Sequence, residues 1–125
     1  MKKTSIAIIS LILLVACTKE EITSRTYPRV LTNNVGPIAS TGTSFHGEIT
    51  LSSTEIVNHG FIWATFSSMA IGYGNNIPLG PKTGIGNFES ALQTSLIKGT
   101  KYYVVAYAQS STYTVYGNVV EFELK

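Results

Sequence analysis

The sequence has no aspartate and contains only two histidines and one cysteine, so few side chains could bind a metal. A carboxylate-rich calcium loop of the EF-hand type depends on aspartate and is therefore not expected. A structural zinc site takes four Cys or His ligands, which this chain cannot supply. We expect no metal and no cofactor, and we interpret His59 as a residue at the end of a strand.

Positive charge is also scarce. The chain carries nine Lys or Arg and seven acidic residues, all of them glutamate. Subtracting Lys2 and Lys3, which belong to the N-terminal leader described next, leaves seven basic residues against seven glutamates. A neutral domain without a basic cluster offers no electrostatic footprint for a nucleic-acid backbone. Nucleic acid is not an expected partner.

The one long apolar run lies at the N-terminus. It extends from Ile6 to Val15, follows the basic start Met1-Lys2-Lys3 and ends at the small residue Ala16. The run is about half of the roughly 20 residues that a membrane-spanning helix needs. A basic start, a short apolar segment and a small residue before the cut are typical of a secretory signal peptide. We therefore expect residues 1–16 to be removed.

The sequence Leu14-Val15-Ala16-Cys17 resembles the lipobox of bacterial lipoproteins. The resemblance implies that Cys17 receives a diacylglycerol, that the leader is cut before it and that the new amine is acylated. The alternative is an ordinary cleaved signal with an incidental cysteine. No intramolecular disulfide is possible with one cysteine. Several acyl chains, each contributing about 0.8 kcal/mol per buried CH₂, would anchor the protein firmly to a membrane.

The residues after Cys17 bear on location. Thr18 stands where aspartate is the familiar inner-membrane retention signal, so we expect the outer membrane. The sequence Lys19-Glu20-Glu21 resembles the surface-export signal of lipoproteins in the Bacteroidetes-type envelope. The alternative interpretation is a solvated charged tether. In either case, residues 17–28 read as a polar, lipid-bearing tether.

Residues 29–125 show short β-branched and aromatic runs between clusters of Gly, Asn, Ser and Pro, a pattern typical of an all-β sandwich or barrel. Seven strands are predicted, which fits a sandwich. The predicted strands are Arg29–Thr32, Ser44–Leu51, Val57–Phe66, Ile77–Leu79, Asn87–Gln93, Lys101–Ser110 and Tyr116–Leu124.

One turn is specific to a particular kind of sandwich. Leu96 is followed by Lys98-Gly99 and then by Tyr102, the spacing of a tyrosine corner, in which the phenol bonds to nearby backbone. With HGFIWAT, GNFESALQ, LIKGTKYYVVAYA and YGNVVEF, the chain resembles the fibronectin type III-like domain of Bacteroidetes-type lipoproteins. The resemblance implies a single fibronectin type III, immunoglobulin-like sandwich over residues 29–125.

Catalytic chemistry is not expected. Ser44, His46 and Glu48 lie on one face of a predicted strand, where they could be imagined as nucleophile, base and orienting group. Successive residues on one face of a strand are about 6.6 Å apart, however. The strand also provides no nucleophile elbow and no oxyanion hole. We interpret these side chains as an exposed polar face, and we expect the residues that alternate with them, Phe45, Gly47, Ile49 and Leu51, to form the opposite face of the strand. We predict that the protein is not an enzyme.

The aromatic residues are the better candidates for binding. If Tyr102 points inward, Tyr103 and Tyr107 point outward, and Phe61 and Trp63 could join them from the neighbouring strand. Such an outer aromatic face could stack a sugar or dock a protein. The alternative is a cross-strand ladder covered by the Ser67–Gly84 loop. The expected function is a binding or adhesion module for protein or glycan, or instead a structural envelope component or accessory subunit.

The lipobox makes a direct prediction about Cys17. The mature protein should begin at a lipid-modified Cys17 and partition into detergent, because its acyl chains prefer the apolar phase. Cys17→Ala should be released from membranes or remain unprocessed. Intact-mass analysis checks this, and an unmodified N-terminus on the mature wild-type protein would contradict it.

Overall fold

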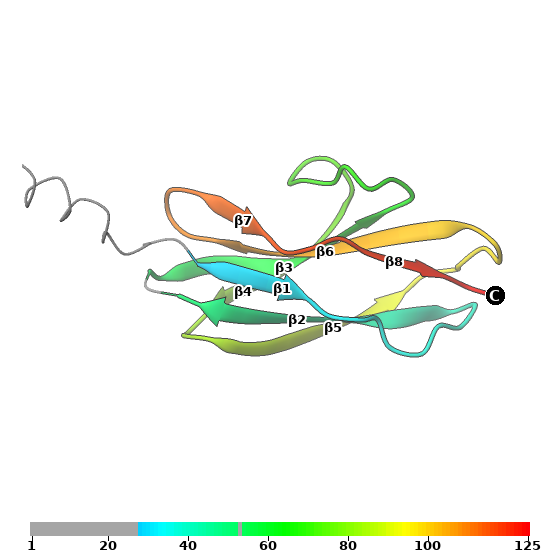
Figure 1. Ribbon diagram of the computed structural model, residues 1–125, viewed down its shortest axis with the longest axis horizontal. Helices are drawn as coiled ribbons and strands as arrows, with labels where there is room; N and C mark the ends of the chain where they lie inside the picture. The colour runs from blue at the N-terminus through cyan, green and yellow to red at the C-terminus, as the bar shows by residue number, and fades with distance from the viewer. Residues whose placement is uncertain (1–27, 53) are drawn as a thin grey trace, which may run out of the picture.

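The computed structural model describes residues 28–52 and 54–125, which form two antiparallel β-sheets packed as a sandwich (Figure 1). One sheet has the order β1-β2-β5, and the other has the order β4-β3-β6, with β7 and β8 both paired to β6. The strands are β1 (Arg29–Thr32), β2 (Gly42–Leu51), β3 (Ile56–Ala64), β4 (Asn75–Lys82), β5 (Gly86–Gln93), β6 (Lys101–Gln109), β7 (Thr114–Tyr116) and β8 (Val120–Glu123). The predicted all-β sandwich is confirmed. Within these residues, no helix is long and apolar enough to cross a membrane.

The last predicted strand, Tyr116–Leu124, is wrong as a single strand, because residues 117–119 separate β7 from β8 and belong to neither strand. The break places Asn118 against β1, where its side-chain amide accepts from Thr32 N–H at 2.9 Å and donates to Thr32 C=O at 3.0 Å. Thr32 Oγ1 in turn accepts from Ala106 N–H at 2.8 Å. Gly117 permits this approach, since a Cβ there would lie 2.7 Å from Thr32 Oγ1. The break therefore ties β1 to the other sheet.

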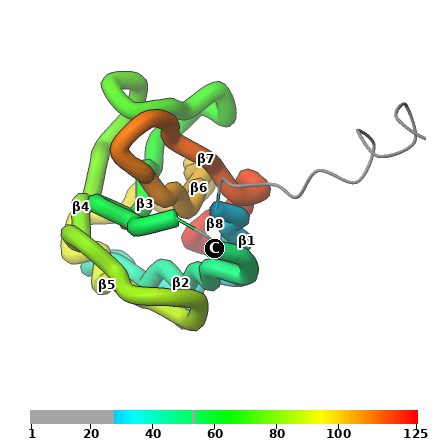
Figure 2. Tube along the Cα trace, turned by 90° about the vertical axis from the view of Figure 1, so that its left-hand side faces the viewer, coloured from blue at the N-terminus to red at the C-terminus, as the bar shows by residue number. Residues whose placement is uncertain are grey.

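The core lies between the two sheets, which Figure 2 shows as two layers. On β2, Phe45, Gly47 and Ile49 are buried, as their alternation with polar residues predicts, whereas Leu51 is exposed. Gly47 faces Ala106 across the sandwich, and a Cβ at Gly47 would lie 3.1 Å from Ala106 Cβ. The largest cluster of buried core residues consists of Phe45, Phe61, Leu92, Leu96, Tyr102, Val104, Ala106 and Phe122.

The turn before β6 has the geometry of a tyrosine corner. The Tyr102 hydroxyl accepts from the Ile97 N–H at 2.9 Å, and the Tyr102 ring stacks on Phe122 with centroids 5.4 Å apart. Gly99 adopts φ +84°, a left-handed conformation that glycine takes without strain. Leu96 is buried in the same core cluster, and its N–H donates to Ser40 C=O at 3.0 Å. The turn therefore links the β5–β6 connection to the core and to the segment before β2.

This geometry predicts unequal effects at two neighbouring tyrosines. Tyr102→Phe should lower the free energy of unfolding by about 0.5–1.5 kcal/mol, because the part-buried hydrogen bond from the Ile97 N–H loses its acceptor. Tyr103→Phe should cost less, since Tyr103 is only half-buried. Urea unfolding of both variants checks this, and equal losses would contradict the assigned role of the Tyr102 hydroxyl.

Candidate functional site

The outer aromatic face expected from Phe61, Trp63, Tyr103 and Tyr107 does not form, and this prediction is wrong. Phe61 is fully buried between the sheets, where its ring lies 5.6 Å from Phe45. Trp63 packs against the same core cluster, with its ring 6.3 Å from that of Tyr102. Tyr107 belongs to a separate buried cluster with Ile62 and Val105. The four aromatics are therefore divided between two faces of the sheet.

The register between β3 and β6 explains the division. Phe61 pairs with Ala106 and Trp63 pairs with Val104, so these residues share the inner face. Gly60 pairs with Tyr107 on the outer face. A Cβ at Gly60 would collide with the Ile77 carbonyl and lie 3.2 Å from the Tyr107 hydroxyl. The Phe61 and Tyr107 rings are therefore each opposite a small residue, Ala106 for Phe61 and Gly60 for Tyr107.

The segment between β3 and β4 covers the outer face of Ile62, Val105 and Tyr107, and Figure 1 shows it rising above β3 and β6. Met69 packs on this cluster, and a Cβ at Gly74 would lie 2.7 Å from Ile62 Cγ2. The Tyr107 hydroxyl donates to Asn76 Oδ1 at 2.8 Å. Burial raises the pKa of Tyr107 above its usual value, so the phenol remains a neutral donor. Tyr107 is a structural residue.

His59 lies inside β3 and between the sheets, so its expected place at the end of a strand is wrong. Its ring meets Phe88 edge-on at 4.8 Å. Its Nδ1 is 2.6 Å from the Gly80 carbonyl oxygen, which can only accept, so Nδ1 carries the proton. Burial lowers the pKa of His59, and the charge of Lys82 lowers it further, against the raising effect of the Gly80 bond. The imidazole is therefore held neutral.

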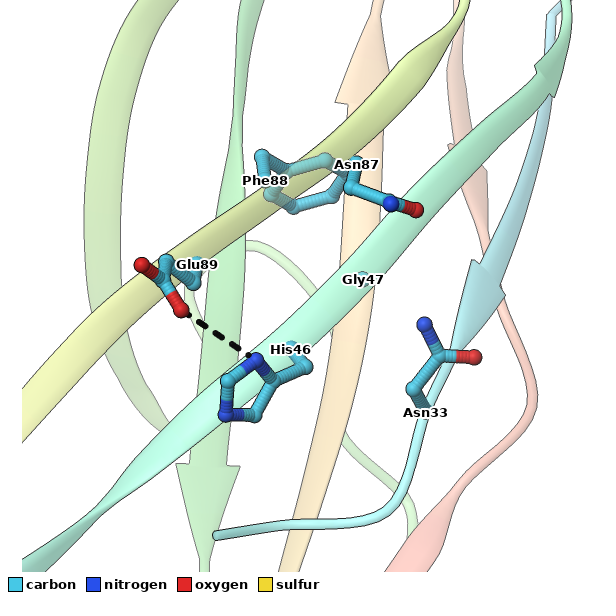
Figure 3. Close-up of a pocket in the computed structure, with 6 residues that line it drawn as sticks. All are labelled: Asn33, His46, Gly47, Asn87, Phe88 and Glu89. Carbon is cyan, nitrogen blue, oxygen red and sulfur yellow. Dashed lines mark ion pairs between the residues drawn. The ribbon is translucent and has the colours of Figure 1, made fainter.

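A polar pocket of about 400 Å³ lies on the outer face of the β1-β2-β5 sheet (Figure 3). Asn33, His46, Gly47, Asn87, Phe88 and Glu89 line it. His46 Nε2 is 3.0 Å from Ser44 Oγ, and His46 Nδ1 is 3.4 Å from Glu89 Oε2. Ser44 and His46 therefore do meet, but the carboxylate beside them is Glu89 of β5. The sequence suggests Glu48 of the same strand, because a neighbour from another strand cannot be identified along one strand.

The chemistry open to this pocket is limited by its surroundings. A serine, a histidine and a carboxylate in contact are the components of nucleophilic catalysis. Yet the Glu89 side chain is 74% exposed, so water weakens its pairing with His46. Gly36 packs against the Ser44 hydroxyl, but its N–H already donates to the Ser44 carbonyl at 2.9 Å and cannot stabilise an oxyanion. The pocket is therefore a group of polar side chains in contact on an open surface.

A different apolar surface is exposed on the segment between β3 and β4. Phe66, Ile71 and Tyr73 are exposed there, and Tyr73 is 69% accessible. The Ile71 N–H donates to the Tyr116 hydroxyl at 3.1 Å, which connects this segment to β7. We call Phe66, Ile71, Tyr73 and Tyr116 the loop surface. From the sequence, this region is expected only as a cover for the aromatic residues. Apolar side chains spaced along a Gly-rich loop are the signal in the sequence that indicates their exposure.

The remaining observations concern metal ligands, Cys17 and similarity to known proteins. Within residues 28–52 and 54–125, no three His, Cys, Asp or Glu side chains gather as a metal site. Cys17, expected to carry the lipid, lies outside the described residues. Comparisons of the chain with protein families, with curated protein sequences and with solved structures found no match.

The neutral His59 predicts a pH dependence of stability. Its pKa is lowered in the folded protein relative to about 6.5 in the unfolded chain. The unfolded state therefore binds the proton more readily, and the free energy of unfolding should fall as the pH drops below about 6.5. His59→Gln should reduce this loss, because the side chain that becomes protonated in the unfolded chain is then absent. Urea titrations between pH 7.5 and 5 check this, and equal slopes in wild type and His59→Gln would contradict it.

Proposed function

We propose that this protein is a non-enzymatic, lipid-anchored component of the bacterial outer membrane that binds another protein through the loop surface. The lipobox ending at Cys17 supports the anchor, and Lys19-Glu20-Glu21 supports display on the cell surface. The sandwich begins at β1, directly after the polar tether of residues 17–28. In this proposal the lipid holds the domain at the membrane while the sandwich presents the loop.

The observation that carries the proposal is the composition of the loop surface. The chain has no Lys, Arg, Asp or Glu from Ile56 to Pro81, and exposed Phe66, Ile71 and Tyr73 lie within this stretch. The central part of a protein interface is typically poor in charge and rich in aromatic residues and Met. Met69 and the Tyr116 hydroxyl hold the loop against the sheet. A held loop loses less conformational entropy on binding than a free one.

The strand arrangement supports the proposed relation to fibronectin type III domains. Three strands, β1, β2 and β5, face a sheet in which β4 pairs with β3 and not with β5. The tyrosine corner at Tyr102 and the Trp63 side chain against the core occupy the places that sandwiches of this type use. Domains with this architecture serve many functions, so the proposed activity depends on the loop surface and not on the fold.

A protein partner is favoured over a glycan. Sugar stacking requires an open aromatic ring face beside polar groups, but Phe61 is buried in the core and Trp63 is partly buried against it. Aliphatic Ile71 beside Tyr73 suits protein contact better. The loss of the outer aromatic face also favours an accessory subunit of a larger envelope assembly over a free-standing adhesin.

A photo-crosslinking residue placed in the full chain in intact cells tests the proposal. The photo-crosslinking residue at position 73, in place of Tyr73, should yield one discrete protein adduct. The amount of this adduct should fall when Phe66→Ser is added. Ile85 on the β4–β5 turn is a matched control, because it is 63% exposed against 69% for Tyr73. The photo-crosslinking residue at position 85 should give no such adduct. Equal adduct patterns from both positions, or none from Tyr73, would contradict the proposal.

A further inference from the structure

The edges of the two sheets differ in how they are protected. An exposed strand edge is a template for pairing with another chain, and proteins usually block it. On β1 the Asn118 amide occupies both the N–H and the C=O of Thr32. On β4 Pro78 and Pro81 have no N–H to donate, and proline in a sheet is confined to such edges. Strand β5 contains no proline and only one charge, Glu89.

The backbone groups on the free edge of β5 can be assigned from its neighbour. The carbonyls of Ser44 and His46 accept from Gly36 and Asn33, so these residues of β2 are directed away from β5. Alternation along an antiparallel ladder then directs Phe45 and Gly47 toward their β5 partners, Ser90 and Phe88. The free edge therefore carries the N–H and C=O groups of Asn87, Glu89, Ala91 and Gln93.

This row is almost without partners. Among the described residues, its one hydrogen bond is long, with 3.4 Å from the Ser90 hydroxyl to the Ala91 carbonyl oxygen. Asn87, Glu89, Ala91 and Gln93 are all exposed. The row is long enough to form a complete antiparallel ladder with another extended strand.

We propose that two copies of this chain pair antiparallel through β5, with the two-fold axis at Ser90. In this register Glu89 exchanges hydrogen bonds with Ala91 of the partner copy, and Asn87 does so with the partner copy's Gln93. The two three-stranded sheets then form one continuous sheet. A two-fold interface uses the same patch on both copies, which a single strand provides when it pairs with itself.

The side chains of β5 favour pairing with a second copy of β5 and favour one register of that pairing. Pairing centred on Ser90 places Phe88 beside the partner copy's Leu92 on the inner face, and it puts no like charges opposite each other. Centring on Glu89 would set two carboxylates face to face, which is unfavourable. Centring on Ala91 would leave Asn87 without a partner in β5 and shorten the ladder.

Net charge does not oppose self-association. The described residues contain five Lys or Arg and five Glu, so two copies carry no net repulsion. Net charge near zero favours association. The paired strands lie on a different part of the molecule from the loop surface, and the dimer does not depend on the proposed function.

A symmetric disulfide tests the register. Ser90 would meet its own copy in a non-hydrogen-bonded pair, with Cα atoms about 4.5 Å apart, which a disulfide can bridge. In the full chain carrying Cys17→Ser in detergent, Ser90→Cys should form a disulfide dimer under mild oxidation. Asn87→Cys is the matched control, because its two copies would lie about 20 Å apart. Crosslinking of Asn87→Cys as readily as Ser90→Cys, or no crosslinking of Ser90→Cys, would overturn the proposal.

Charge variants at Ala91 give a second test that needs no thiol. The dimer contains two equivalent pairs in which Ala91 of one copy lies opposite Glu89 of the other. Ala91→Lys should therefore lower the dimer Kd by charge attraction, and Ala91→Glu should raise it by repulsion, each by roughly tenfold. Lysine on an edge strand ordinarily prevents pairing, so tightening by lysine is specific to this register. Light scattering in detergent across a concentration series measures the dimer Kd of both variants and of the wild type. A monomeric wild type, or weakening by both variants, would contradict the proposal.

Discussion

The register between β3 and β6 is the constraint on which the rest of this structure depends. It sets Phe61 against Ala106 on the inner face and Tyr107 beside Gly60 on the outer face. The inner ring then completes a cluster with Phe45, Phe88 and Phe122, and the small residues Gly47 and Ala106 let the two sheets approach. The outer ring requires a cover, which the segment between β3 and β4 supplies. The partly buried Met69 belongs to this cover, and Phe66 and Tyr73 of the same segment remain exposed.

The two sides of the sandwich are built differently. On one side, Asn118 and Thr32 join β1 to β6, and the interruption between β7 and β8 makes this contact possible. On the other side, β4 and β5 end their sheets without a connecting ladder. The prolines of β4 block one of these edges and leave β5 as the open one. One side therefore contributes to the stability of the fold, and the other is available for assembly.

Much of the fold follows from local sequence. The alternation along β2 predicts its buried face, and the spacing from Leu96 to Tyr102 predicts a turn whose phenol reaches the Ile97 N–H. The orientation of β3 could not be predicted in this way, because Phe61, Ile62, Trp63 and Ala64 are apolar on both faces. Only the pairing with β6 decides which face is inner. The contact of His46 with Glu89 was likewise missed, because it depends on a neighbouring strand distant in sequence.

A double-mutant cycle at Phe61 and Ala106 tests the β3–β6 register most directly. Phe61→Leu removes volume, and Ala106→Val adds volume at the residue directly opposite, so each should lower the free energy of unfolding by about 1–3 kcal/mol. If the two side chains share the inner face, the double variant should lose less than the sum, with a coupling energy of about 0.5–3 kcal/mol. Losses that add to within about 0.5 kcal/mol would show that the two residues are not neighbours in the core, and this would contradict the account.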